Sequence, residues 1–180
     1  MISRMLAACT AVAIAATPAL AELPRGAKAP VFTAQGALAG KNMAFNLRSA
    51  LAKGPVVLYF YPKAFTQGCT LEANAFAEAM DEFEAAGATV IGMSNDDIAT
   101  LKRFSTEHCR DRFPVAAASP KLIRAYDVSL ERDGQKTGLT KRTSYVIAQD
   151  GTIAFVHSDM DYRDHVKLTL AAVKRLKSKD

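Results

Sequence analysis

Residues 54–62 read GPVVLYFYP, and this short stretch decides the fold. Val56 to Tyr61 form an unbroken run of apolar, β-branched and aromatic residues, opened by Gly-Pro and closed by Pro62. Such a run between turn residues predicts a strand buried on both faces of its sheet. Helices must then cover the two faces, so the run indicates an α/β protein.

The segments on either side of this strand alternate between helical and extended patterns. Residues 22–54, rich in Pro, Gly and Ala, predict short strands and turns, with a short helical or turn element over 44–52. We expect helices over 69–86, 98–108, 120–126 and 162–176, and strands over 88–94, 113–115, 143–148 and 152–157.

Turn and capping residues support these boundaries. Asn95-Asp96-Asp97 offers an N-cap to the second helix, and Asp150-Gly151 is a strong hairpin signal between the last two strands. The order β-α-β-α, then a hairpin and a helix, predicts a mixed central sheet with helices on both faces. Its first half is parallel through right-handed crossovers and its hairpin antiparallel. This α/β arrangement resembles the thioredoxin-like fold.

The composition excludes several classes of protein. The chain has 180 residues, of which 49% are hydrophobic and 23% charged, enough for one domain with a sizeable core. Collagen-like, disordered and disulfide-dense proteins need a different composition. The net charge is +5, but the basic residues 174–179 are better explained as a solvated helix end that complements the helix dipole. We therefore expect no nucleic-acid partner.

Residues 1–21, MISRMLAACTAVAIAATPALA, have the layout of a secretory signal peptide. Arg4 supplies the positive start, an uncharged apolar run follows, and Ala19-Leu20-Ala21 places small residues at the cleavage site. Cleavage after Ala21 would leave residues 22–180 as a single domain, either periplasmic or secreted. The apolar run is shorter than the ~20 residues of a membrane-spanning helix, so no membrane partner is expected after cleavage.

Cys69 and Cys109 remain after this cleavage, whereas Cys9 is removed. A lipoprotein-type cut before Cys9 is disfavoured, because it would leave most of the apolar run on the mature protein. In an oxidising compartment the two remaining cysteines can form a disulfide. Two cysteines suit one redox couple as well as one structural bridge, and composition leaves both open.

Cys69 follows the buried strand and a short loop, and it lies in the first turn of the expected helix. The positive end of the helix dipole and the unpaired backbone N–H groups there favour the thiolate over the thiol. The thiolate is the nucleophilic form. The alternative is that Cys69 is a small buried hydrophobic residue, as many single cysteines are.

The residues around Cys69 carry a resemblance to a known family. Pro62-x-x-x-Thr66-x-x-Cys69 resembles the active-site signature of the peroxiredoxins, and residues 59–72, YFYPKAFTQGCTLE, resemble the bacterioferritin-comigratory-protein or Q-type branch. Further segments that fit this branch are Ser94-Asn95-Asp96, Phe113-Pro114, 125–128 (AYDV) and 142–147 (RTSYVI). The resemblance therefore extends from about Gly26 to the last helix.

This resemblance implies a role for each motif residue. Cys69 would be the peroxidatic nucleophile that becomes a sulfenic acid, and Thr66 would hold the peroxide and the sulfur through its hydroxyl. Pro62 would shield the pocket. Arg142 would stabilise the thiolate and the charge on the leaving oxygen. The alternatives are that Thr66 only caps a helix, Arg142 is a solvated surface charge and Pro62 ends a strand.

The resolving cysteine is less settled. In many Q-type enzymes it lies five residues after the peroxidatic cysteine, but that position here is Asn74. Other members carry it on the next helix, and Cys109 lies near the end of that expected helix. A Cys69–Cys109 bond needs Cα atoms within about 7 Å, so the first turn at Cys69 would have to unwind. The alternative is that Cys109 is a buried or spectator thiol.

The resemblance implies an exported thiol peroxidase. It would reduce hydrogen peroxide, and organic hydroperoxides as a second class, as a monomer or homodimer recycled by a thioredoxin-like dithiol reductant. We expect no cofactor or metal, because His108, His157 and His165 lack close ligand spacing and no phosphate-binding glycine motif is present.

Two other functions remain open from the sequence. A thiol–disulfide oxidoreductase normally has two close cysteines at the helix start, which residues 67–71, QGCTL, lack. A non-catalytic binding or holdase protein could keep the same fold with a structural Cys69–Cys109 bridge.

Overall fold

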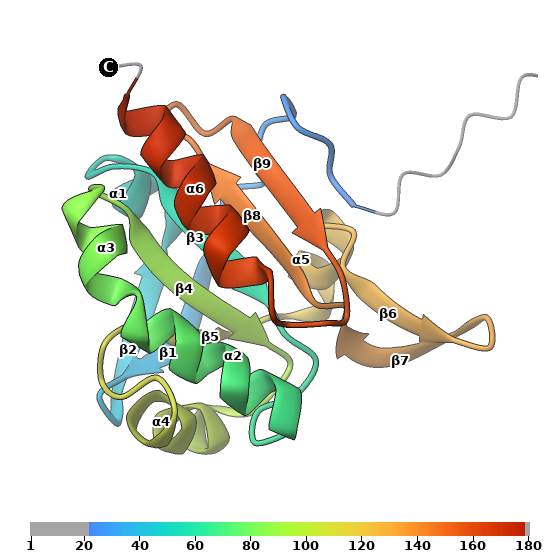
Figure 1. Ribbon diagram of the computed structural model, residues 1–180. Helices are drawn as coiled ribbons and strands as arrows, with labels where there is room; N and C mark the ends of the chain where they lie inside the picture. The colour runs from blue at the N-terminus through green and yellow to red at the C-terminus, as the bar shows by residue number, and fades with distance from the viewer. Residues whose placement is uncertain (1–21, 179–180) are drawn as a thin grey trace, which may run out of the picture.

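The central sheet of the computed structural model, which describes residues 22–178, has seven strands. They are β1 (Thr33–Leu38), β2 (Lys41–Asn46), β3 (Val56–Phe60), β4 (Thr89–Ser94), β5 (Val115–Ala117), β8 (Thr143–Ile147) and β9 (Ile153–Ser158). Their spatial order is β2-β1-β5-β4-β3-β8-β9 (Figure 1). β3, β4 and β5 run parallel, whereas β8 is antiparallel to β3 and to β9. The predicted mixed sheet is confirmed.

Strand β3 lies inside this sheet, and all five of its residues are buried. Its side chains alternate between two hydrophobic clusters, because successive residues of a strand point to opposite faces. Val57 and Tyr59 belong to one cluster and Val56, Leu58 and Phe60 to the other. The predicted doubly buried strand is therefore confirmed.

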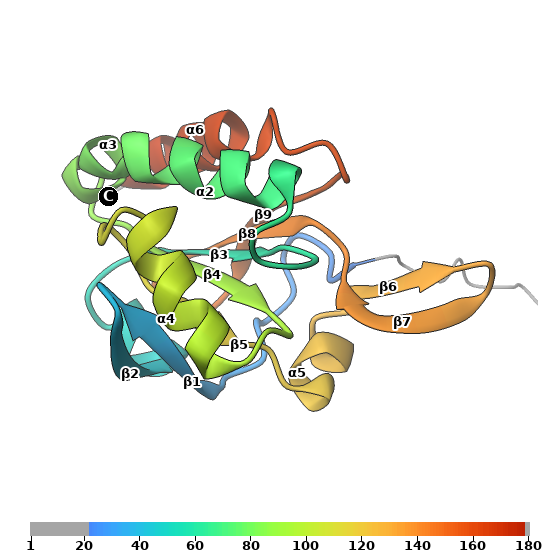
Figure 2. The same cartoon turned by 90° about the horizontal axis from the view of Figure 1, so that it is seen from below.

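Helices cover both faces of the sheet, as predicted. They are α1 (Leu47–Leu51), α2 (Gln67–Glu78), α3 (Met80–Ala85), α4 (Ile98–Glu107), α5 (Pro120–Ala125) and α6 (His165–Lys177). Figure 2 shows α2, α3 and α6 together over one face and α5 on the other. The first face also takes the buried side chains of α4, and the second those of α1.

The single helix predicted over 69–86 is wrong in two respects. It begins two residues earlier, and Ala79 (φ −87°, ψ 0°) divides it into α2 and α3. The N–H of Ala79 lies 3.2 Å from the carbonyl of Ala75 and 3.1 Å from that of Phe76, a shared bond of the kind that ends a helix. Met80 and Phe83 stay buried beyond the break, so the apolar periodicity continues across it and gives no sign of it.

A second, two-stranded sheet is absent from the sequence expectations. β6 (Ser129–Arg132) and β7 (Gln135–Thr140) form a hairpin that projects from the body of the protein (Figures 1 and 2). Residues 131–138 are all exposed, so the hairpin has no buried face to produce an alternating pattern. Its turn uses Asp133 and Gly134, both with positive φ.

Most other boundaries agree within a few residues, but the strand predicted over 113–115 lies two residues later, at Val115–Ala117. Asp97 caps α4 by accepting a backbone N–H group, as expected, and Ser119 caps α5 in the same way. The final helix begins at His165 rather than at residue 162. Among residues 22–178, no helix combines the length and apolar character needed to cross a bilayer. The predicted signal peptide, residues 1–21, lies outside the described residues.

Candidate active site

Cys69 occupies the first turn of α2, as predicted, directly behind the loop that follows β3. Its side chain is only 1% exposed. Asp96, after β4, holds this loop in place by accepting the backbone N–H of Ala64 at 2.8 Å and the hydroxyl of Ser94 at 2.7 Å. Phe65 has a left-handed backbone (φ 63°), an uncommon conformation for a large side chain. The loop is therefore shaped by tertiary contacts.

Thr66 is the N-cap residue of α2, but its side chain does not cap the helix. Its carbonyl accepts the N–H of Thr70 at 2.9 Å, whereas its hydroxyl donates to the carbonyl of Lys63, also at 2.9 Å. Thr66 is therefore the N-cap by its backbone position, and its hydroxyl makes no capping hydrogen bond. Pro62 lies half-buried and Thr66 exposed on the same short loop as Cys69. Their parts in peroxide binding stay predictions.

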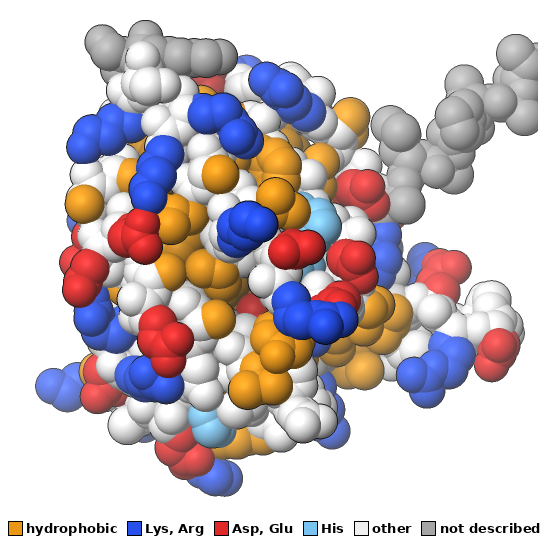
Figure 3. Space-filling model, viewed as in Figure 1, with side chains coloured by type: hydrophobic (Ala, Val, Ile, Leu, Met, Phe, Trp, Pro, Cys, Tyr) orange, Lys and Arg blue, Asp and Glu red, His pale blue; other side chains and the backbone are white. Residues whose placement is uncertain are grey.

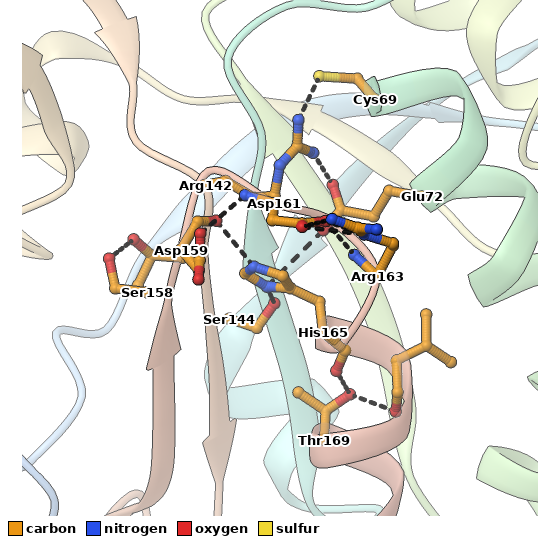
Figure 4. A network of polar contacts seen from close by, with 12 residues as sticks. Cys69, Glu72, Arg142, Ser144, Ser158, Asp159, Asp161, Arg163, His165 and Thr169 are labelled. Atoms are coloured by element: carbon orange, nitrogen blue, oxygen red, sulfur yellow. Dashed lines mark hydrogen bonds and ion pairs between the residues drawn. The ribbon is translucent and has the colours of Figure 1, made fainter. Parts of the chain in front are cut away.

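Arg142 is buried, with 4% of its surface exposed, so the alternative of a solvated surface charge is wrong. It lies directly before β8, and the pairing of β8 with β3 brings it next to α2. Its Nη2 donates to Cys69 Sγ at 3.5 Å, its Nε to the carbonyl of Met160 at 3.0 Å, and its Nη1 to Glu72. Figure 4 shows the guanidinium between the sulfur and the carboxyl group.

Gly68 leaves room for the Arg142 guanidinium beside Cys69. A Cβ atom at Gly68 would lie 3.2 Å from Arg142 Nη2, tighter than an ordinary van der Waals contact. A side chain at this position would therefore press on the guanidinium that contacts the sulfur.

Glu72 is a functional candidate that the sequence analysis missed. It is fully buried and pairs with Arg142 through Oε2, while Oε1 has no hydrogen-bond partner among the described atoms. Burial raises the pKa of Glu72 to about 8, and the charge of Arg142 opposes this shift. Glu72 follows Cys69 by three residues on one helix, a spacing that places both on one face. That spacing was the available signal.

His165 and Ser144 lie behind Glu72. The Nδ1 atom of His165 is 2.8 Å from Ser144 Oγ, and its Nε2 is 2.9 Å from the carbonyl oxygen of Asp159. Nδ1 also lies 3.7 Å from Glu72 Oε1. Burial lowers the pKa of His165 to about 4. Residues from α2, β8 and α6 thus form one polar network that leads from Cys69 to His165 (Figure 4).

Cys109 lies just beyond the end of α4 and is fully buried. It shares a hydrophobic cluster with Cys69, Tyr59 and Tyr61. Both cysteines are free thiols. Burial, with a smaller effect of Asp111, raises the pKa of the Cys109 thiol. Because the thiolate is the reactive form, Cys109 must become more exposed before it can react.

Three large apolar side chains are exposed on the segments that carry Cys69 or contact Arg142. Phe65 is 36% exposed, Leu71 41% and Met160 50%. Phe65 lies in the loop before Cys69, Leu71 lies two residues after it, and the carbonyl of Met160 binds Arg142. Figure 3 shows hydrophobic side chains gathered over the start of α2. We call Phe65, Leu71 and Met160 the apolar rim.

No group of three or more His, Cys, Asp or Glu side chains is arranged to hold a metal ion in the part of the chain that the structure describes. The three histidines are not brought together. His157 and His165 have ring centroids 4.6 Å apart, whereas His108 packs against Phe65 and Phe104.

Comparisons with known proteins identify the family of this chain. Residues 25–156 match the model of the AhpC/TSA family. A chloroplastic peroxiredoxin Q of Gentiana triflora is 33% identical over 142 residues, which cover 77% of this chain and 61% of the relative. The peroxiredoxin Bcp of Xanthomonas campestris pv. campestris is 32% identical over 122 residues, covering 66% of this chain and 76% of the relative.

Solved structures of related proteins have a similar fold. Peroxidoxin BcpB from Mycobacterium tuberculosis superposes with a TM-score of 0.74 at 28% identity, covering 84% of this chain and 97% of that one. The bacterioferritin comigratory protein of Xanthomonas campestris, described with an alkyl peroxide reduction activity, superposes with a TM-score of 0.70 at 29% identity. That match covers 79% of this chain and 91% of the other. The predicted thioredoxin-like architecture is confirmed.

The matched region contains Pro62, Thr66, Cys69 and Arg142, the four residues of the predicted motif. The chain spans less than two thirds of some plant relatives, 61% for the Gentiana protein. The family model covers residues 25–156, more than half of the chain. This chain therefore belongs to the AhpC/TSA family, the family of the peroxiredoxins.

Proposed function

We propose that this protein is a thiol peroxidase that reduces hydrogen peroxide through Cys69. One observation carries the proposal, the 3.5 Å contact between Arg142 Nη2 and Cys69 Sγ in a buried site at the start of a helix. A cation that cannot deprotonate, fixed beside a sulfur, stabilises negative charge both on the thiolate and on the oxygen that leaves it.

Cys69 alone supplies the two electrons that reduce the peroxide. The thiolate of Cys69 attacks the distal oxygen of the hydroperoxide, an S–O bond forms, and the O–O bond breaks. The other oxygen leaves with the bonding electron pair and takes up a proton to become water or an alcohol. Cys69 is oxidised to the sulfenic acid and the peroxide is reduced. Thr66 Oγ1 would hold the peroxide against the sulfur, and Pro62 would limit the access of water.

Cys109 is our candidate for the resolving thiol. Its sulfur would displace water from sulfenic Cys69 to form a Cys69–Cys109 disulfide, which a thioredoxin-like dithiol protein would reduce. Both thiols are buried in one hydrophobic cluster. A disulfide needs Cα atoms within about 7 Å, and we propose that α2 unwinds near Cys69 and the end of α4 opens to bring the two sulfurs together. No cofactor takes part in this cycle.

Replacing Cys109 with serine should spare the first oxidation and change recycling. We expect the Cys109→Ser variant to form sulfenic acid at the wild-type rate and to accumulate it, because no second thiol removes it. Steady-state turnover with thioredoxin and thioredoxin reductase should then fall at least about tenfold. Trapping of the sulfenic acid and mass mapping measure the first step. Unchanged turnover would contradict the resolving role.

The apolar rim supports organic hydroperoxides as a second substrate class. We infer that the alkyl group of a bound organic hydroperoxide reaches this exposed apolar rim, which hydrogen peroxide is too small to do. Losing about one methylene contact costs about 0.8 kcal/mol, or a factor of about four. We therefore expect Leu71→Ser to lower the rate constant for cumene hydroperoxide about fourfold and to leave that for hydrogen peroxide unchanged.

The matched control is Val31→Ser, since Val31 is also exposed, at 56%, and lies far from Cys69 in the sequence. Stopped-flow oxidation with both peroxides gives the two rate constants for each variant. An equal effect of Leu71→Ser on both peroxides would contradict contact with the alkyl group.

We also propose that the protein is exported to the periplasm or secreted, on the strength of residues 1–21 alone. The mature protein would begin at Glu22 and act as a monomer or homodimer. Mass measurement of the N-terminus in cell fractions tests this. A chain that keeps residues 1–21 and stays with the cytoplasm would contradict export.

A further inference from the structure

The polar network behind Arg142 contains two buried atoms that compete for one proton. The carbonyl of Asp159 lies 2.9 Å from His165 Nε2 and accepts hydrogen bonds only, so the proton of the neutral ring resides on Nε2. Nδ1 then carries a lone pair, and it accepts the hydroxyl of Ser144 at 2.8 Å. Glu72 Oε1 faces this lone pair at 3.7 Å and has no hydrogen-bond partner among the described atoms.

An ionised Glu72 beside a neutral His165 would leave Oε1 without a donor in a buried site, because Nδ1 carries no proton and already accepts the Ser144 hydroxyl. Buried polar groups without a partner are costly, and the cost rises where the surroundings are apolar. One proton between Oε1 and Nδ1 removes this conflict, and a closer approach of about 1 Å would make a normal hydrogen bond. Burial favours the neutral form of both groups, so the proton belongs mainly to Glu72.

The position of this proton decides the charge beside Cys69. When Glu72 is protonated, the positive charge of Arg142 is uncompensated and acts on the sulfur through Nη2. When the proton is lost, the Glu72 carboxylate neutralises the guanidinium through Nη1. The same arginine then gives less stabilisation to negative charge on the sulfur and on the leaving oxygen.

We propose that His165 is a positioning residue for the peroxidase reaction, which keeps a proton on the Glu72–His165 pair so that the charge of Arg142 is directed at Cys69. This inference rests on the proposed function. Ser144 competes with Glu72 for the same nitrogen, and Asp159 sets the tautomer that makes the nitrogen an acceptor.

Other titratable and charged groups also face the pair. His157 on β9 has its ring centroid 4.6 Å from that of His165, and Arg142 and Cys69 lie on the far side of Glu72. Asp159 acts on His165 by its charge as well as by its carbonyl. Asp161 lies nearby but pairs with the exposed Arg163, which holds the pKa of Asp161 at about 2, so this carboxylate stays ionised throughout.

The rate constant for Cys69 oxidation should fall as the pH rises. The pKa of Glu72, raised to about 8 by burial, means that the pair loses its proton as the pH rises through that value. The net charge of Arg142 and the pair then falls by one beside Cys69. We expect the rate constant for Cys69 oxidation to decline about tenfold between pH 7 and pH 10, as one charge is lost beside the sulfur.

Two variants separate this role from a merely structural one, because they change the pH profile in opposite directions. His165→Gln lets an amide N–H bind Glu72 Oε1 and favours the carboxylate. It should be about tenfold slower than wild type at pH 7 and lose the alkaline decline. Ser144→Ala leaves Nδ1 to Glu72 alone and should move the decline to higher pH. His157→Gln, at the half-buried neighbour, should keep the wild-type profile.

Stopped-flow oxidation of the reduced full chain across pH 6–10 measures these profiles, and circular dichroism checks the fold. Profiles of His165→Gln and Ser144→Ala that coincide with that of His157→Gln would overturn the proposal. If His165→Gln does not fold, the upward movement for Ser144→Ala remains decisive, and its absence would overturn the proposal.

Nitrogen-15 NMR of the histidine side chains gives a readout independent of activity. His165 should show the Nε2–H tautomer, and its Nδ1 signal should move near pH 8 in the wild type but not in Glu72→Gln. If the Nδ1 signal moves in the same way in Glu72→Gln as in the wild type, the proposal for His165 is overturned. This outcome does not depend on how fast Cys69 is oxidised. Oxidation of wild-type Cys69 no faster than that of a free thiol would contradict the proposed function.

Discussion

Cys69→Ser is expected to abolish peroxide reduction. The rate constant for oxidation by hydrogen peroxide should fall by at least about a thousandfold, to the background level, because a serine hydroxyl at neutral pH is a weak nucleophile that no base activates here. The fold should survive, since serine is nearly the same size and its hydroxyl oxygen can accept the Arg142 N–H that contacts the sulfur. Steady-state peroxide consumption and intact mass after peroxide treatment measure the effect.

Cys109→Ser is the matched control, because it removes the other buried thiol and keeps the residues around Cys69. It should still consume one equivalent of peroxide per chain and gain one oxygen atom at Cys69. If Cys69→Ser retained peroxide reduction, or if the oxygen appeared on Cys109 first, the assignment of the peroxidatic cysteine would be wrong.

Arg142→Lys should lower the rate constant for Cys69 oxidation by about a hundredfold to a thousandfold, the usual cost of losing one preorganised donor at a developing negative charge. Arginine reaches the sulfur, Glu72 and the carbonyl of Met160 at once, from three nitrogens of one planar group. A lysine ammonium has one nitrogen and must choose between them. Because lysine keeps the positive charge, the loss of rate measures the contribution of the guanidinium's geometry.

Arg163→Lys is the control for this substitution, because Arg163 is a nearby arginine whose side chain is 76% exposed and pairs with Asp161. It should leave the rate constant unchanged. The double variant Arg142→Lys with Glu72→Gln removes the competing carboxylate and should recover part of the lost rate. A single Arg142→Lys variant within about threefold of wild type would contradict the role of the guanidinium.

Much of the fold could be predicted from the sequence, because burial leaves a clear local pattern. The run from Val56 to Tyr61 identified the central strand, and Asp97 marked the start of α4. The break at Ala79 could not be seen, since the apolar face continues through it. The exposed β6–β7 hairpin could not be seen either, since no face of it is buried over residues 131–138.

The residues of the site also include some that the sequence could predict and one that it could not. Cys69 and Arg142 were predicted from a motif, and their contact was then found. Glu72 follows Cys69 by three residues on one helix, so the spacing could have identified it. His165 could not be found from a local pattern. Its contact with Glu72 joins residues 93 positions apart and exists only because α6 packs across α2 and β8.

The most direct test of the central claim is stopped-flow oxidation of the reduced protein by hydrogen peroxide, with trapping and mass mapping of the oxidised sulfur. We predict rapid, stoichiometric oxidation at Cys69, first to the sulfenic acid and then to a disulfide with Cys109. Oxidation no faster than that of an ordinary free thiol would contradict a peroxidatic site. It would favour instead a non-catalytic binding protein with the same fold.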